Sequence, residues 1–172
     1  TWILTFYLIA SGLIIPCVDF LCKKFGRNNF FMFSIVLFTV ASLLCGCSRS
    51  LMEIIFARFL QGLGGGAILP LAQSIMLESF PKKDRGKAMG MFGFAVVIGP
   101  ILGPVIGGWI TENWSWPFIY LINLPFGIFA FLASKMLLED SPDGRKIDGI
   151  KLDTFGVIFL VFWIVTLQVV LD

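Results

Sequence analysis

Six long apolar stretches alternate with short polar connectors along the chain. The stretches cover residues 1–21, 29–47, 51–80, 88–110, 117–138 and 153–171. About 20 apolar residues in a helix are enough to cross the ~30 Å hydrocarbon core of a bilayer. Only a helix satisfies all its backbone groups within one segment in lipid. The pattern therefore predicts an all-α integral membrane protein with six transmembrane helices.

The composition agrees with a membrane protein. Hydrophobic residues make up 58% of the chain and charged residues only 14%, whereas soluble domains carry roughly 25% charged residues. Residues 88–111 and 114–134 hold no charge at all. The net charge is +2, and the basic residues are scattered between apolar stretches, so nothing indicates a nucleic-acid partner.

Basic residues gather in alternate connectors. Eleven of the 13 lie in or beside the connectors after the first, third and fifth stretches: Lys23, Lys24, Arg27, Lys82, Lys83, Arg85, Lys87, Lys135, Arg145, Lys146 and Lys151. The opposite connectors hold only Arg49, and Arg58 lies inside a stretch. The positive-inside rule then predicts that the connectors after the first, third and fifth helices are cytoplasmic. Trp109, Trp114 and Trp116 would mark the outer interface.

Arg58 is the most informative residue, because it lies about 10 Å below the outer end of the third stretch. A charge at that depth is costly unless it faces a cavity or a partner, so Arg58 is a candidate for an ion, proton or substrate pathway. Gln61, three residues further on, shares its helix face. The alternative is structural: the side chain snorkels outward or bonds to carbonyls of a neighbouring helix.

Glycines follow Arg58 and recur in the fourth stretch. Gly62 and Gly66 predict close helix packing beside the buried charge. In the fourth stretch, Gly99, Gly103 and Gly107 repeat every four residues and form a smooth stripe on one face. Pro100 and Pro104 lie beside that stripe, and each is expected to bend the helix. The whole string comprises Gly93, Gly99, Pro100, Gly103, Pro104, Gly107 and Gly108.

Acidic and metal-binding chemistry is sparse within the stretches. Asp19, Glu53 and Glu78 all lie near helix ends, so no proton carrier is visible at mid-membrane. If the protein moves protons, the titrating acid is expected on a helix outside this chain. Asp19 lies one turn before Lys23 and could pair with it. The chain has no His, and its four cysteines show no zinc spacing, which predicts no metal and no cofactor. The sequence contains no cluster of nucleophile, base or metal ligands that would indicate an enzyme.

Together these residues resemble the major facilitator superfamily and, within it, the EmrB/QacA-like drug:proton antiporters with fourteen helices. The six stretches look like the second to seventh of those helices. The segment from Arg58 through Gln61 and Gly62 to Gly66 resembles the family's fourth-helix motif, whose Arg is linked to proton coupling. The string from Gly93 to Gly108 resembles the fifth-helix antiporter motif, which is associated with export.

Residues 19–28 resemble the cytoplasmic loop motif of the same family only in part. Gly26 and Arg27 match it, whereas Asp19 stands where the usual opening glycine lies and Lys23 where the usual Asp lies. That departure puts the charge-relay role of the loop in doubt here.

The resemblance implies a division of the chain. Residues 1–138 would form part of an N-terminal bundle with five helices, residues 139–153 a cytoplasmic loop, and residues 154–172 a linking transmembrane helix. The chain begins inside an apolar stretch without an initiator Met, so we expect it to be a piece of a longer protein.

The resemblance also implies a function: proton-driven export of hydrophobic or amphipathic drug-like molecules across the bacterial inner membrane, by alternating access. Its partners would be protons, the substrate and the lipid bilayer, and EmrB-like exporters often work with a periplasmic adaptor and an outer-membrane channel. Two alternatives remain open. One is an importer or facilitator for a polar metabolite in the same fold, and a more distant one is a membrane-embedded scaffold or enzyme.

Overall fold

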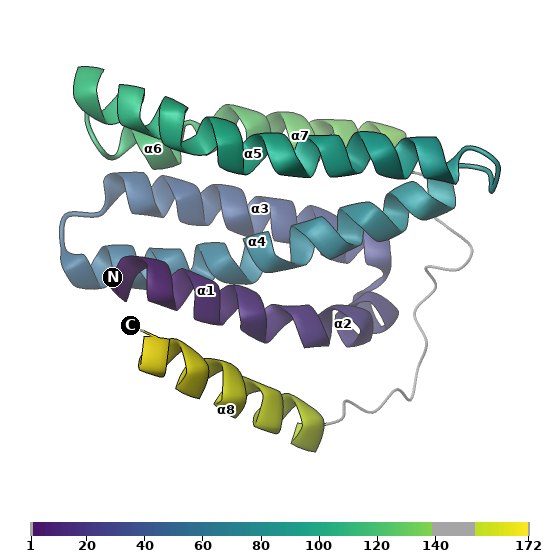
Figure 1. Ribbon diagram of the computed structural model, residues 1–172, viewed down its shortest axis with the longest axis horizontal. Helices are drawn as coiled ribbons and strands as arrows, with labels where there is room; N and C mark the ends of the chain where they lie inside the picture. The colour runs from purple at the N-terminus through teal and green to yellow at the C-terminus, as the bar shows by residue number, and fades with distance from the viewer. Residues whose placement is uncertain (1, 139–153, 172) are drawn as a thin grey trace.

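The computed structural model describes residues 2–138 and 154–171, and the regular elements of this part of the chain are all helices, without a β-strand. The elements are α1 (Trp2–Ile14), η1 (Ile15–Cys17), α2 (Val18–Phe25), α3 (Arg27–Cys47), α4 (Leu51–Ser79), α5 (Arg85–Asn113), α6 (Phe118–Leu121), α7 (Asn123–Leu137) and α8 (Thr154–Leu171). Figure 1 shows most of them lying along one common direction. The all-α prediction is confirmed, while the predicted cytoplasmic loop at 139–153 lies outside the described residues.

Within residues 2–138 and 154–171, five helical segments are long and apolar enough to cross a membrane: Trp2–Phe25, Arg27–Cys47, Leu51–Ser79, Arg85–Asn113 and Phe118–Leu137. The sixth predicted helix, α8, has 18 residues and therefore a length of about 27 Å. Helices extend past the predicted apolar stretches, since α5 begins at Arg85 and the first segment continues to Phe25. Apolar residues mark the part of a helix that lies in lipid, whereas the hydrogen-bonded helical backbone continues into the polar residues on either side.

Helix α4 is the centre of the bundle and packs against both α1 and α3. A Cβ on Gly62 would collide with the backbone oxygen of Tyr7, and one on Gly66 would lie 2.7 Å from the oxygen of Ser11. On the opposite side, a Cβ on Gly64 would lie 2.7 Å from the backbone nitrogen of Phe38. The missing side chains therefore let α4 touch the backbones of both neighbours.

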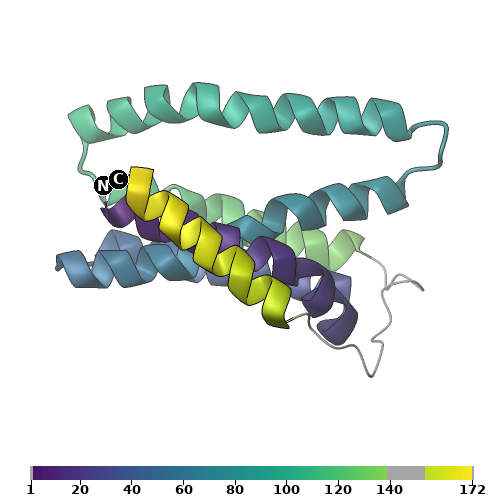
Figure 2. The same cartoon turned by 60° about the horizontal axis from the view of Figure 1, so that its bottom comes forward.

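Helix α5 stands apart from this packed group, as Figure 2 shows. A Cβ at any of its stripe glycines, Gly93, Gly99, Gly103, Gly107 and Gly108, would meet nothing within 4 Å. Helix α5 continues through Pro100 and Pro104, and Figure 2 shows no sharp kink along it. Each proline follows a glycine, and the absence of a Cβ there removes part of the clash that a proline ring makes with the preceding residue.

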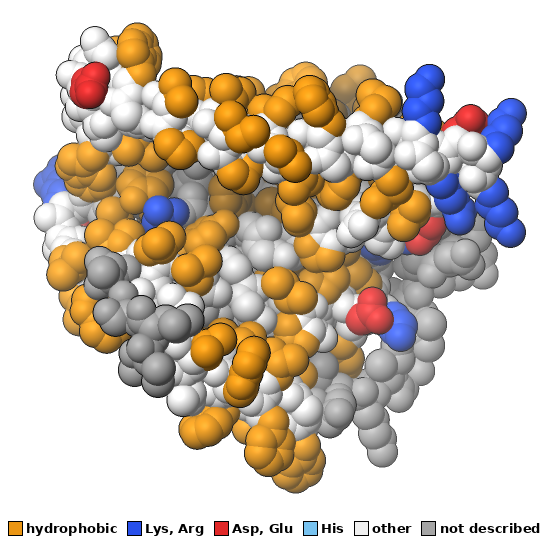
Figure 3. Space-filling view, viewed as in Figure 1, with side chains coloured by type: hydrophobic (Ala, Val, Ile, Leu, Met, Phe, Trp, Pro, Cys, Tyr) orange, Lys and Arg blue, Asp and Glu red, His pale blue; other side chains and the backbone are white. Residues whose placement is uncertain are grey.

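Charged side chains concentrate at one end of the molecule. Figure 3 shows Lys and Arg gathered where α4 turns into α5. At the other end, Trp109, Trp114 and Trp116 are exposed, and the Trp114 ring meets the Phe118 ring edge-on at 4.9 Å. Helix α8 lies against α1, where a Cβ on Gly12 would come within 3.1 Å of the Ile164 side chain.

Candidate functional site

The side chain of Arg58 is joined to α3 by a chain of hydrogen bonds. Arg58 Nη1 donates to Gln61 Oε1 at 2.9 Å. Gln61 Nε2 donates to Ser42 Oγ at 2.7 Å, and Ser42 Oγ donates to the Phe38 carbonyl at 2.8 Å. Gln61 and Ser42 are both buried. The network therefore fixes the guanidinium relative to two helices inside the bundle.

Two tyrosine rings hold the guanidinium of Arg58. Its Cζ lies 5.3 Å from the ring centroid of Tyr7 in α1 and 4.7 Å from that of Tyr120 in α6. Aromatic rings attract a cation through their negative faces, and the attraction is stronger away from water. Arg58 is thus placed by side chains from α1, α3, α4 and α6, and it does not snorkel freely to the outer end.

The positive charge of Arg58 has no carboxylate partner within the described part of the chain. The ion pair found there involves Arg27 and Glu78 instead. Arg58 Nε is buried and makes no hydrogen bond. A buried donor without a partner costs free energy, so this arrangement favours an acceptor that these residues do not supply. Chemically, the site can bind a carboxylate or another anion.

The loop between α2 and α3 forms a second polar contact. Gly26 adopts φ 86°, a conformation that side chains disfavour, and this lets α2 end and α3 begin at once. Arg27 then forms an ion pair with Glu78 and reaches Ser74 Oγ at 3.5 Å, both in α4.

The pair predicted between Asp19 and Lys23 does not form among the described residues. Both side chains are exposed, and an ion pair between exposed side chains one helical turn apart contributes little free energy. Arg27 takes the ion-pair role in this loop through its contact with Glu78.

The predicted site residues are only partly brought together. Arg58, Gln61, Gly62 and Gly66 lie on α4 in the packed group, whereas the stripe from Gly93 to Gly108 lies on α5, which stands apart.

Sequence reasoning missed Tyr7, Ser42 and Tyr120. A signal did exist for two of them, because Tyr7 and Tyr120 are the only tyrosines of the chain. Across the described residues, no group of three or more His, Cys, Asp or Glu could hold a metal ion.

Comparison with known proteins shows which protein family the chain resembles. The sequence pattern of the Major Facilitator Superfamily matches residues 1–170. The multidrug export protein EmrB of Haemophilus influenzae is 37% identical over 172 residues, which is 100% of this chain and 33% of that protein. EmrB of Escherichia coli is 35% identical over 175 residues, and multidrug resistance protein 3 of Bacillus subtilis is 36% identical over 171 residues.

The apolar helices and their packing define a multi-pass membrane helix bundle. The chain belongs to the Major Facilitator Superfamily. It spans about a third of the length of the curated relatives that it matches.

Proposed function

We propose that the whole protein to which this chain contributes exports hydrophobic or amphipathic small molecules in exchange for protons. The observation that carries the proposal is Arg58, a half-buried cation held by Gln61 and two tyrosine rings without an acid partner in the described residues. The relatives in Haemophilus influenzae and Escherichia coli are named multidrug export proteins, which favours the same direction and substrate class.

In this mechanism, Arg58 pairs with a titratable acid on a helix outside the chain. Ionised, the acid is held by the guanidinium, and the bundle keeps one of its two access states. When a proton neutralises the acid, the ion pair weakens and the other state becomes more populated. Substrate binding favours one state and protonation the other, so the two fluxes are coupled. Gln61 and Ser42 keep the guanidinium in place through both states.

The glycine stripe of α5 would serve the movement between states. Gly99, Gly103 and Gly107 leave a smooth face that is open in the described structure. A helix from the remainder of the protein could lie against such a face at short range and slide with little obstruction. The stripe would then seal one side of the substrate path in one state.

The topology and the partners are part of the same proposal. The connectors after the first, third and fifth helices lie in the cytoplasm of a bacterial cell, in keeping with their basic residues. Residues 1–138 belong to the N-terminal bundle and residues 154–172 to a linking helix. A periplasmic adaptor and an outer-membrane channel complete the export path in cells with two membranes.

The test uses the full-length parent protein in inside-out membrane vesicles with an acidified lumen. A panel of lipophilic cations and weak acids is added, and the pH gradient is followed with a fluorescent weak base. We expect exported compounds to dissipate part of the gradient. Arg58→Ala should abolish the response, and Arg58→Lys should weaken it, because an ammonium cannot stack and donate as a guanidinium does.

A different result would favour the alternative reading. Full coupled efflux in Arg58→Lys would count against a specific role of the guanidinium. A labelled polar metabolite that equilibrates across the membrane, while no lipophilic compound affects the gradient, would indicate an importer or facilitator instead.

A further inference from the structure

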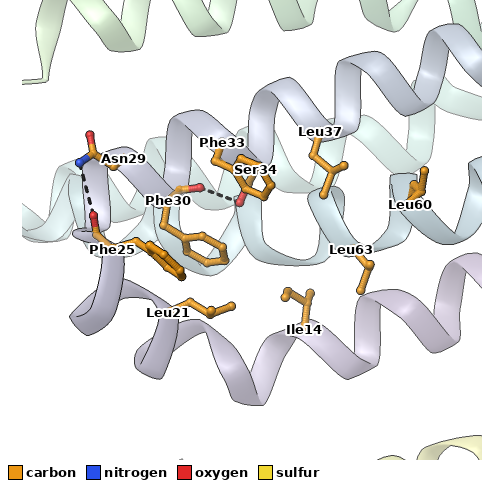
Figure 4. Close-up of a pocket in the computed structure, with 10 residues that line it drawn as sticks. All are labelled: Ile14, Leu21, Phe25, Asn29, Phe30, Phe33, Ser34, Leu37, Leu60 and Leu63. Carbon is orange, nitrogen blue, oxygen red and sulfur yellow. Dashed lines mark hydrogen bonds between the residues drawn. The ribbon is translucent and has the colours of Figure 1, made fainter. Parts of the chain in front are cut away.

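A second feature of the bundle lies away from Arg58. A pocket of about 710 Å³ separates α1 and α2 from α3, with α4 as its floor. It is lined by Ile14, Leu21, Phe25, Asn29, Phe30, Phe33, Ser34, Leu37, Leu60 and Leu63, whose side chains Figure 4 shows. Phe33 on its edge is 59% exposed, so the pocket opens to the outside of the described bundle. We refer to it as the α3 groove.

The lining of the α3 groove is hydrocarbon in character. Its two polar side chains, Asn29 and Ser34, already donate to backbone carbonyls, Asn29 to Phe25 at 3.3 Å and Ser34 to Phe30 at 2.8 Å (Figure 4). Ser34 is buried and its hydroxyl proton is engaged, whereas Asn29 is exposed, so a polar ligand deep in the groove would lose its hydration with little replacement. An alkyl chain loses nothing there. Between Asn29 and Leu37 the groove follows about 12 Å of helix, enough for a substantial part of an acyl chain.

The groove and the Arg58 network lie on opposite faces of α4. Leu63 lines the groove and Gln61 belongs to the network. Helix positions that are two residues apart in sequence point about 200° apart around the helix axis. Occupation of the groove is thus distinct from binding at Arg58. The two sites share helices α1, α3 and α4 but no side chain.

One end of the groove carries free positive charge. Lys24 Nζ lies 5.4 Å from the ring centroid of Phe25, a lining residue, and 5.8 Å from that of Phe20. Lys23 beside it is exposed, and so is Asp19 one turn earlier, which leaves a net charge of one positive unit on these three side chains. Arg27 is engaged with Glu78. An ammonium group held at the mouth of an apolar groove matches a ligand with an anionic head and a hydrocarbon tail.

We propose that the α3 groove binds an anionic phospholipid of the leaflet that faces Lys23 and Lys24. One acyl chain lies along Phe30, Phe33 and Leu37, and the phosphate contacts Lys24. The bilayer surrounds a membrane-spanning bundle, so lipid is present at this surface at high concentration. Basic side chains beside a groove between transmembrane helices select anionic headgroups from that supply. The proposal does not depend on the direction of transport.

The experiment compares lipid retention by the full-length parent in native mass spectrometry, with phosphatidylglycerol and phosphatidylcholine of identical acyl chains. We expect a preference for phosphatidylglycerol that falls roughly 5-fold for each lysine removed in Lys23→Gln/Lys24→Gln. The matched control is Lys82→Gln/Lys83→Gln, which removes two charges from the α4–α5 connector and should keep the preference. Leu37→Trp, which fills the groove, should lower retention of both lipids.

Crosslinking identifies the occupant directly. Phe33→p-benzoylphenylalanine, irradiated in membranes, should yield an adduct with the mass of a phospholipid. An adduct with another segment of the protein would overturn the proposal, because the groove would then be a helix-packing surface. So would an equal loss of preference in the Lys82/Lys83 control, which would indicate a general effect of charge. Unchanged retention in both the lysine and the Leu37→Trp variants would also overturn it.

Discussion

Arg27 and Glu78 lie 51 residues apart in the sequence and form an ion pair in the structure. Arg27 is the first residue of α3, and Glu78 lies in the last turn of α4, so the pair ties the α2–α3 loop to the same end of the central helix. Arg27 is largely covered, while the Glu78 side chain is 39% exposed. The contact is thus a half-hydrated link between two elements at the predicted cytoplasmic surface.

Reversing one charge of this pair should destabilise the protein slightly, and reversing both should restore it. For Arg27→Glu we expect a loss of about 1 kcal/mol or less in the free energy of unfolding, because the exposed carboxylate is screened by water. Thermal denaturation of the detergent-solubilised parent gives the measurement. Lys82→Glu, an equal charge change on the exposed α4–α5 connector, is the control. Absence of rescue in Arg27→Glu/Glu78→Arg would show that the pair contributes nothing.

Gln61 should be costly to replace, because it bonds to both Arg58 and Ser42. Gln61→Met keeps the volume but leaves the half-buried Arg58 and the buried Ser42 without that partner, and we expect a loss of about 1–3 kcal/mol. Gln73→Met on the exposed face of the same helix is the matched control and should be nearly neutral. Both variants are compared by thermal denaturation, followed by the vesicle efflux assay. Equal stability of the two variants would contradict a network role for Gln61.

Much of the helical arrangement could be predicted from local pattern, and the residues of the network show where that ends. Apolar stretches locate the helices, because both the length needed to cross a bilayer and the hydrogen bonds of a helix depend only on residues within one segment. The spacing of Arg58 and Gln61 also predicts their shared face. Ser42 and Tyr120 come from other helices, and periodicity along α4 does not say which helix faces it. Glu78 was visible as an acid near a helix end, but not as the partner of Arg27.

The glycines of α4 and of α5 also show that the sequence does not reveal which element packs against a helix face. The sequence shows small residues on one face of α4 and of α5, and it cannot show what lies opposite. The structure places backbone atoms of α1 against Gly62 and nothing within 4 Å of a Cβ on Gly103. For the described chain, only the first group is in close contact with a neighbour.

Adding one methyl group at Gly62 should therefore disturb the bundle. A Cβ there collides with the Tyr7 carbonyl and lies 2.8 Å from the Ala10 Cβ, so α1 must move away from α4. We expect Gly62→Ala to lower the free energy of unfolding by about 1–3 kcal/mol, as overpacking does. Gly86→Ala is the control, since a Cβ there meets nothing within 4 Å and alanine favours helix. If Gly62→Ala melts at the temperature of Gly86→Ala, α1 and α4 are not in close backbone contact.

The ring of Tyr120 should matter more than its hydroxyl, because its contact with Arg58 is with the ring face, at 4.7 Å from the centroid. Tyr120→Phe keeps that face, and we expect near-normal stability and proton-coupled efflux. Tyr120→Leu removes it and should cost about 0.5–2 kcal/mol, with weaker coupling as Arg58 loses its position. Phe118→Leu, in the same short helix but facing Trp114, controls for general loss of an aromatic ring. In an Arg58→Lys background the difference between the Phe and Leu variants should shrink, since the ammonium stacks less well. Equal behaviour of Tyr120→Phe and Tyr120→Leu would mean that the ring does not hold the guanidinium.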